Sequence, residues 1–234
     1  MNKRELNALV VMPAYNEAQN IAAIIAETRE IEPSFDIVVV DDGSTDNTAK
    51  IARDVGARVL QLPFNIGVGG AMRTGFKFAR ESQYDCVVQI DADGQHDPNF
   101  LAVLLEQLDT FDIVIGARFA GEGEYVVSGP RKWAMAMLSW SLSRICDTHL
   151  TDTTSGFKAL GPRAIELFAE RYPAEYLGDT VEALVIARRN GLRVTQVPVA
   201  MRNRSGGQPS QSPFRAAMYL GRALIALLIG LSRR

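Results

Sequence analysis

Cysteine is scarce in this sequence: only Cys86 and Cys146 occur among its 234 residues. Two isolated cysteines lack the spacing of a zinc site and are too few for a disulfide framework, so they fit a reducing compartment. A signal peptide is also missing, because residues 1–7 are polar and the apolar run after them is only as long as one strand. We therefore expect a cytoplasmic protein.

Long hydrophobic runs are missing as well, since no stretch reaches the roughly 18 consecutive apolar residues of a membrane-spanning helix. Acidic residues are absent after Glu182, whereas nine arginines follow it. The formal net charge of -2 therefore hides a strongly basic C-terminal end. This asymmetry predicts an anionic partner at that end and does not indicate general affinity for nucleic acid.

The remaining composition is that of one well-packed domain, with 47% hydrophobic and 22% charged residues. Short apolar segments rich in Val and Ile alternate with helical patterns, as strands buried on both faces do. These segments are residues 8–12, 36–40, 58–62, 86–90 and 112–115. The alternation predicts an α/β fold with a mostly parallel central sheet flanked by helices, and ligands at the carboxyl ends of the strands.

Helix signals follow two of these segments. Thr45 is a candidate N-cap for a helix that runs to Val55, and Asp97 is a candidate N-cap with proline at the first helical position. The regular alternation ends at Arg118. Beyond it we expect, in order, a glycine-rich loop, a helix over residues 130–146, the segment DTTSGFKAL, a capped helix ending near residue 191, and a strand over residues 193–201.

The segment VVQIDADGQHD, residues 87–97, ends an apolar strand in a cluster of carboxylates. Asp91 and Asp93 are separated by one residue, so both point to the same side of an extended segment and can face one cation. Hard oxygen ligands suit Mg²⁺ or Mn²⁺, which complete their shell with water and phosphate oxygens. The motif therefore predicts a divalent cation and a nucleotide diphosphate. The alternative is that these acids only cap the next helix.

Four motifs in order carry a family resemblance: PAYNE, DDGSTD, DADGQH and GARF. They resemble the inverting nucleotide-sugar glycosyltransferases of family 2, which have the GT-A fold, and most closely the polyprenyl-phosphate type that includes dolichol-phosphate mannosyltransferases. The resemblance runs from Val10 to about Gly207. It implies a metal-dependent enzyme that moves a hexose from a UDP- or GDP-sugar to a polyprenyl phosphate such as dolichyl or undecaprenyl phosphate.

The resemblance also implies roles on the donor side. The residues that match nucleoside-binding positions are Pro13, Tyr15, Glu17 and Asp42. The residues that match metal and diphosphate positions are Asp91, Asp93 and Gln95. Arg118 matches a donor-site arginine. Arg202, in the segment MRNRSGG, resembles a mobile basic segment that closes over the diphosphate.

On the acceptor side, Arg131 and Lys132 resemble a pair that faces the acceptor phosphate, and Asp152 and Glu182 match acceptor-side positions. We place Ser155 among the acceptor-binding residues too. A hydroxyl acceptor needs a general base to take its proton, whereas a lipid phosphate is already anionic and needs cations that align it. Asp152 is our candidate for an orienting residue. Glu182 is a second candidate, although an acid at a helix start also suits the helix dipole.

The stretch NIGVGGAMRTG, residues 65–75, superficially matches a dinucleotide-binding fingerprint, but Met72 stands where the third glycine belongs. We expect these glycines, Gly69 among them, to let backbone approach the donor, followed by a helix that carries Arg73. His96 is either a metal ligand or proton shuttle, or a polar loop residue that bonds a neighbour. His149 is predicted to be structural.

Residues 1–212 are predicted to form the catalytic domain and residues 213–234 an amphipathic basic helix capped by Ser212. Such a helix suits a membrane surface, with arginines toward lipid headgroups, which would place the enzyme peripherally on the cytoplasmic face. A membrane partner protein could supply the same attachment. The alternative is packing on the chain's own core or on a second subunit of a homo-oligomer.

Other functions remain open at this point. The same donor chemistry could serve a glycan, glycerate-type or protein hydroxyl. A nucleotidyltransferase also uses paired carboxylates and magnesium, but it should carry a glycine-rich loop with Lys or Arg directly after the first strand, where MPAYNE stands. A catalytically silent nucleotide-sugar-binding protein is the last alternative.

Overall fold

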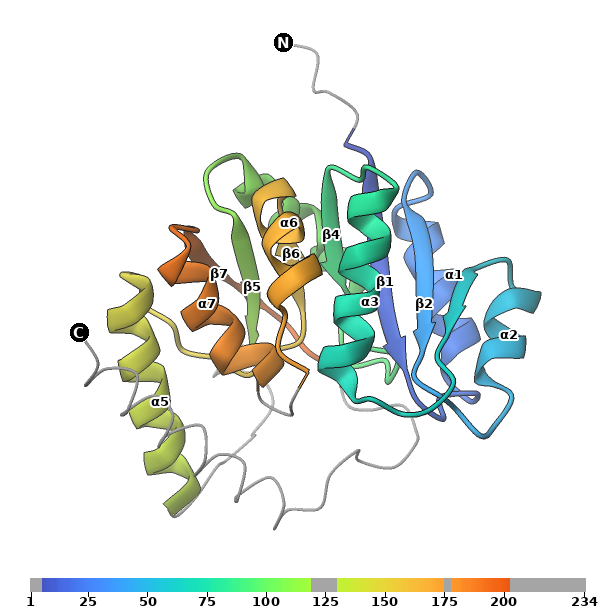
Figure 1. Ribbon diagram of the computed structural model, residues 1–234, viewed down its shortest axis with the longest axis horizontal. Coiled ribbons are helices and arrows are strands. Elements are labelled where there is room, and N and C mark those ends of the chain that lie inside the picture. Colours follow the sequence, from blue (N-terminus) through green and yellow to red (C-terminus); the bar gives the residue numbers. More distant parts are fainter. Residues whose placement is uncertain (1–5, 119–129, 175–177, 203–234) are drawn as a thin grey trace.

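A computed structural model describes residues 6–118, 130–174 and 178–202 (Figure 1). The strands are β1 (Ala8–Ala14), β2 (Asp36–Asp41), β3 (Arg58–Gln61), β4 (Cys86–Gln89), β5 (Ile113–Arg118), β6 (Lys158–Leu160) and β7 (Val194–Val199). The helices are α1 (Ile21–Ile31), α2 (Thr48–Asp54), α3 (Val68–Glu81), α4 (Leu101–Glu106), α5 (Pro130–Cys146), α6 (Pro162–Arg171) and α7 (Ala183–Arg189). Single turns are η1 (Pro98–Phe100), η2 (Gln107–Asp109) and the π-helical η3 (Gly178–Glu182).

The strands form one seven-stranded sheet in the order β3-β2-β1-β4-β6-β5-β7. Every pairing is parallel except those of β6, which runs antiparallel to both β4 and β5. The predicted mostly parallel α/β sheet is thus confirmed. Strand β6 was not predicted from the sequence, because its three residues within DTTSGFKAL are too few to show a strand pattern.

Helices cover both faces of the sheet, which explains why the inner strands β1, β2 and β4 are mostly apolar and buried. Along β1, Leu9 and Val11 join the core beneath α3 and α6, while Val10 and Met12 join the core beneath α1 and α4. Figure 1 shows α3, α6 and α7 on the near side of the sheet and α5 beside α7 at its edge. The carboxyl ends of the parallel strands lie at one edge of the sheet, where α/β folds carry their ligands.

Two helix predictions have different outcomes. Asp97 does cap a helical turn, because its Oδ1 accepts a hydrogen bond from the N–H of Asn99 at 3.0 Å. The prediction for Thr45 was wrong, since α2 begins only at Thr48, whose N–H donates to Oδ1 of Asp46 at 2.9 Å. The N–H of Thr45 instead donates to Oδ1 of Asn16 at 2.8 Å, so a contact between two loops replaces the expected cap.

Both cysteines are free and buried. Burial disfavours the thiolate and raises the pKa of Cys86 to about 12 and that of Cys146 to about 11. Thiols in this condition are poor nucleophiles and poor metal ligands. They act as small apolar core residues.

Within the described residues, none of the helices combines the length and the apolar character that crossing a membrane requires. The predicted amphipathic helix, residues 213–234, lies outside the described residues.

Candidate active site

The loops after β1 and β2 are joined into one unit at the carboxyl edge of the sheet. The N–H of Asn16 donates to Oγ of Ser44 at 2.9 Å, and the N–H of Glu17 donates to Oγ1 of Thr48 at 2.9 Å. The motifs PAYNE and DDGSTD, far apart in sequence, therefore form one wall. Of the side chains predicted there, Tyr15 is 45% exposed, whereas that of Glu17 is buried and accepts a hydrogen bond from Nδ2 of Asn20 at 2.8 Å.

Asp42 is buried at the end of β2 and accepts two backbone hydrogen bonds, from Ile66 at 2.8 Å and from Gly67 at 2.9 Å. Burial raises the pKa of Asp42, and the nearby Asp41 acts in the same direction, while the two hydrogen bonds oppose them. The carboxylate thus ties the loop before α3 to the wall that carries Pro13 and Tyr15. Any hydrogen bond to a nucleoside would be made by a carboxylate that is already held in place.

The DADGQ segment turns immediately after β4 and brings its predicted ligands into one loop. Oδ1 of Asp93 accepts a hydrogen bond from the N–H of Gln95 at 3.0 Å, and the side chain of Asp91 remains 35% exposed. Among the described residues, no cluster of three or more His, Cys, Asp or Glu side chains could hold a metal by itself. Two carboxylates with space for water and diphosphate oxygens are nonetheless the usual donor set for Mg²⁺. The residues present fit the predicted cation.

His96 lies directly behind this loop. Its Nδ1 accepts a hydrogen bond from the N–H of Asp91 at 3.0 Å, and its ring stacks on Phe157 with centroids 5.0 Å apart. With Nδ1 occupied as an acceptor, the proton of the neutral ring is on Nε2, which lies 3.7 Å from Oδ2 of Asp91. Neither nitrogen is available to a metal, so of the two interpretations the structure favours the polar residue that bonds a neighbour.

Arg202, predicted at the diphosphate, lies beside the DADGQ loop and is bound by two carboxylates. Its guanidinium makes two contacts with Glu27, at 2.7 and 2.8 Å, and one with Oδ1 of Asp97 at 2.8 Å. The backbone N–H of Arg202 donates a hydrogen bond to the carbonyl of Gln95 at 2.9 Å. The hydrogen bond to Glu27 and the charge of Asp97 raise the pKa of Arg202. Burial alone would raise the pKa of Asp97, but hydrogen bonds from Asn99 and the charge of Arg202 lower it.

On the acceptor side, residues 152–156 lead into β6. Asp152 is buried, and its Oδ1 accepts hydrogen bonds from the N–H and Oγ1 of Thr154 at 3.2 and 3.1 Å. Ser155 is also buried and accepts a hydrogen bond from the N–H of Phe157 at 3.2 Å. Glu182 is exposed at the end of η3.

Three predicted arginine and lysine positions can be placed only by their backbone. Arg118 ends β5, where it pairs with Val199 of β7. Arg131 and Lys132 lie in the first turn of α5. Their side chains lie outside the described part of the chain.

The family model described as Glycosyl transferase family 2 matches residues 9–167, from β1 into α6. The chain belongs to glycosyltransferase family 2. An undecaprenyl-phosphate mannosyltransferase of Micrococcus luteus is 33% identical in an alignment of 221 positions that covers 88% of this chain and 88% of that one. A UDP-N-acetylglucosamine–dolichyl-phosphate N-acetylglucosaminyltransferase of Methanococcus voltae is 31% identical in an alignment of 211 positions that covers 81% of this chain and 83% of that one.

Solved structures agree on the fold. Glucosyl-3-phosphoglycerate synthase of Mycobacterium tuberculosis, in complex with Mg²⁺ and UDP, superposes with a TM-score of 0.67 at 26% identity, covering 97% of this chain and 79% of that one. The protein is therefore a glycosyltransferase with the GT-A fold, as its motifs led us to expect. In that relative the fold holds a divalent cation and a nucleoside diphosphate.

Two residues that we expected at the donor of this glycosyltransferase lie where α3 meets the end of α6 and the segment after it. A Cβ atom on Gly69 would lie 2.2 Å from the carbonyl oxygen of Pro173 and 2.9 Å from Cα of Ala174. Nη2 of Arg73 donates a hydrogen bond to the carbonyl of Glu170. These contacts pack α6 and the segment after it against α3. The expected approach of the two residues to the donor stays a prediction.

The structure also adds Gln89 and Gly156, two residues that the sequence analysis missed. Nε2 of Gln89 donates a hydrogen bond to Oδ1 of Asp91 at 3.0 Å. A Cβ atom on Gly156 would lie 2.7 Å from Oδ2 of the same carboxylate. The polar residue inside the apolar run VVQI was the available signal for Gln89. Gly156 could not be found without knowing that β6 lies beside β4.

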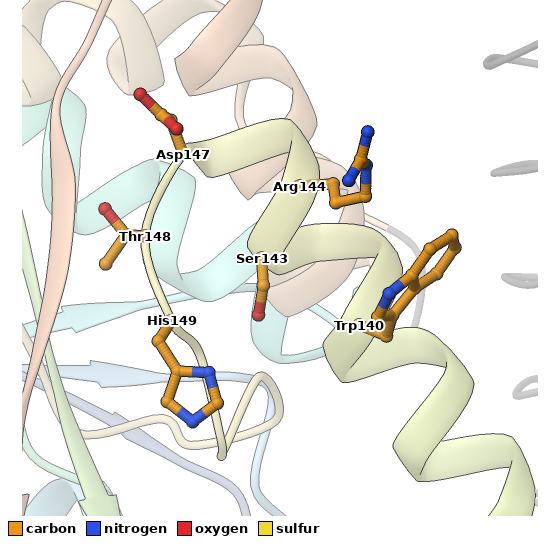
Figure 2. Close-up of a pocket in the computed structure, with 6 residues that line it drawn as sticks. All are labelled: Trp140, Ser143, Arg144, Asp147, Thr148 and His149. Atoms are coloured by element: carbon orange, nitrogen blue, oxygen red, sulfur yellow. The ribbon is translucent and has the colours of Figure 1, made fainter.

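A separate pocket lies at the C-terminal end of α5 (Figure 2). Its lining residues are Trp140, Ser143, Arg144, Asp147, Thr148 and His149. None of the predicted donor, metal or acceptor residues lines it. His149, which we predicted to be structural, is exposed in this pocket, and we assign it no part in glycosyl transfer.

Proposed function

We propose that this enzyme is an inverting, metal-dependent hexosyltransferase that moves a hexose from a UDP- or GDP-sugar to a polyprenyl phosphate. The observation that carries the acceptor is that relatives named for undecaprenyl-phosphate and dolichyl-phosphate transfer match more than four fifths of this chain and of their own. The observation that supports the donor is the pair Asp91 and Asp93 in one loop at the end of β4.

The donor would lie along the wall formed by the loops after β1 and β2. Pro13, Tyr15, Glu17 and Asp42 would hold the nucleoside. Asp91 and Asp93, with Gln95, would hold Mg²⁺ or Mn²⁺, which when bound supplies positive charge next to the leaving diphosphate. Arg118 would add a guanidinium on the same side, since it ends β5.

In the transfer step, an oxygen of the acceptor phosphate forms a bond to the anomeric carbon while the bond from that carbon to the diphosphate oxygen breaks. The bonding electrons leave with the diphosphate, and attack from the opposite face inverts the carbon. The phosphate is already anionic, so no general base is required. Arg131 and Lys132 would align it and Ser155 would contribute to its binding, while Asp152 and Glu182 are the proposed orienting residues on the acceptor side.

A direct assay tests this function. The protein with Mn²⁺ would be given radiolabelled UDP-glucose, UDP-N-acetylglucosamine or GDP-mannose, each with undecaprenyl phosphate or with 3-phosphoglycerate. We expect label from one donor to enter the organic phase only when the lipid phosphate is present. Label found only in a water-soluble product would identify a hydroxyl acceptor instead. Absence of nucleoside diphosphate release with every pair would indicate a nucleotide-sugar-binding protein without activity.

The basic C-terminal segment is proposed to attach the catalytic domain, residues 1–212, to the cytoplasmic face of the membrane, where a lipid-linked acceptor would lie. In residues 213–234 arginines recur on one side of the helical pattern and leucines on the other. We expect the whole chain to sediment with anionic liposomes, less so at high salt, and the chain ending at Ser212 to remain in solution while it still binds nucleotide. Equal sedimentation of the two proteins would show that the segment serves the fold, a partner protein or a homo-oligomer.

A further inference from the structure

A buried amide lies directly beneath the proposed metal site. Gln89 is the last residue of β4 and is only 2% exposed, among the apolar residues Val87, Val88 and Ile90. A primary amide withdrawn from water costs free energy unless it finds new hydrogen-bond partners. Its Nε2 donates to Oδ1 of Asp91 at 3.0 Å. The buried amide of Gln89 thus donates its hydrogen bond to one oxygen of the proposed metal ligand Asp91.

The neighbouring strand shapes the other side of this carboxylate. β6 runs antiparallel to β4 with Lys158 opposite Gln89, so residues two apart on either strand face the same way. Gly156, two residues before Lys158, therefore lies against Asp91. A Cβ atom there would be 2.7 Å from Oδ2 of Asp91 and 3.0 Å from Nε2 of Gln89. The first distance is shorter than real Cβ contacts and the second is tighter than most of them, so with a side chain at this position the carboxylate of Asp91 or the amide of Gln89 would have to shift.

The same strand also supports the backbone of Asp91. The N–H of Asp91 donates to Nδ1 of His96, and the ring of His96 stacks on Phe157 at an interplanar angle of 16°. Phe157 stands between Gly156 and Lys158, directly before β6. Gly156 thus lies against the side chain of Asp91, and Phe157 supports the main chain of Asp91 through His96.

We propose that Gln89 and Gly156 are positioning residues for Asp91, which set its carboxylate in one orientation before the cation arrives. This inference deepens the proposed metal site and rests on it. Gln89 restrains one oxygen by donating a hydrogen bond, and the missing side chain at Gly156 leaves the space that this orientation needs. Partners of metal ligands commonly change metal affinity by about 10- to 100-fold when they are removed.

The test compares Mn²⁺ binding by variants of the whole chain in the presence of UDP and, separately, GDP, with free Mn²⁺ measured by electron paramagnetic resonance. Gln89→Leu keeps a buried side chain of similar volume but removes the donor, and we expect it to weaken Mn²⁺ binding about tenfold. Gly156→Ala should weaken it too. Gln61→Leu is the control, because it is the same substitution at the last residue of another strand, β3, where the exposed Gln61 accepts a hydrogen bond from Arg53. It should leave Mn²⁺ affinity unchanged.

Two further readouts separate positioning from general damage to the fold. Nucleotide affinity without metal and the midpoint of thermal unfolding should be unchanged in Gln89→Leu. The unbranched variant Gln89→Met should show the same weaker Mn²⁺ binding and the same unchanged values of these two readouts. Unchanged Mn²⁺ affinity in both Gln89 variants, with binding lost in Asp91→Asn, would overturn the inference and leave the metal site intact. A fall in metal-free nucleotide affinity as large as that in Mn²⁺ affinity would also overturn it. Unchanged Mn²⁺ affinity in Asp91→Asn would overturn the metal site itself.

Discussion

Replacing Asp91 or Asp93 by asparagine is expected to lower the rate of sugar transfer at least about 100-fold while the protein remains folded. Each change keeps the size of the side chain and removes one negative charge from the loop after β4. Both side chains are partly exposed, so no buried core is lost. Turnover with Mn²⁺ and the thermal unfolding midpoint without metal measure the two effects.

The control for these variants is Asp85→Asn. Asp85 directly precedes β4, at the end opposite the DADGQ loop, and accepts a hydrogen bond from the N–H of Asn7. It therefore carries the same charge away from the proposed site. Mn²⁺ with UDP or GDP should raise the unfolding midpoint of the unchanged protein and of Asp85→Asn, but not that of Asp91→Asn or Asp93→Asn. Full Mn²⁺-dependent turnover in both aspartate variants would refute the metal assignment.

The strands and the edge that carries the site could be predicted because they depend on local pattern. A strand buried on both faces needs a run of apolar residues, and β1, β2 and β4 each show one that ends in polar motifs. In a parallel sheet such ends meet at one edge. The motif DADGQH could therefore be placed at that edge from its sequence alone.

The residues that the sequence analysis missed depend on contacts between distant segments. β6 is reversed and inserted between β4 and β5, and its short run gives no sign of this order. The closeness of Gly156 to Asp91 follows only from that insertion. For the same reason the packing contacts of Gly69 and Arg73 with residues 170–174 could not be foreseen.

The contacts of Arg202 also join segments that are distant in sequence, and they lead to a prediction. Its guanidinium joins Glu27 of α1 to Asp97. The backbone N–H of Arg202 donates to the carbonyl of Gln95, and the neighbouring Met201 forms a β-bridge with His96. We expect Arg202→Ala to lower the transfer rate about 30-fold and to weaken Mn²⁺ binding as well, because it loosens the loop that carries the metal ligands. A direct contact with the leaving diphosphate would instead lower the rate and leave Mn²⁺ affinity unchanged.

A second variant decides between these two roles without touching the arginine. Glu27→Gln removes the charge that holds Arg202 from α1, and Glu30→Gln is its control on the same helix, at an exposed position. If Arg202 works by tying the DADGQ loop to α1, Glu27→Gln should reduce both rate and Mn²⁺ affinity, in the same direction as Arg202→Ala but less. If Arg202 works by reaching the diphosphate, freeing it from Glu27 should leave the rate unchanged or raise it. Because the structure shows the guanidinium held by two carboxylates, we expect the first result.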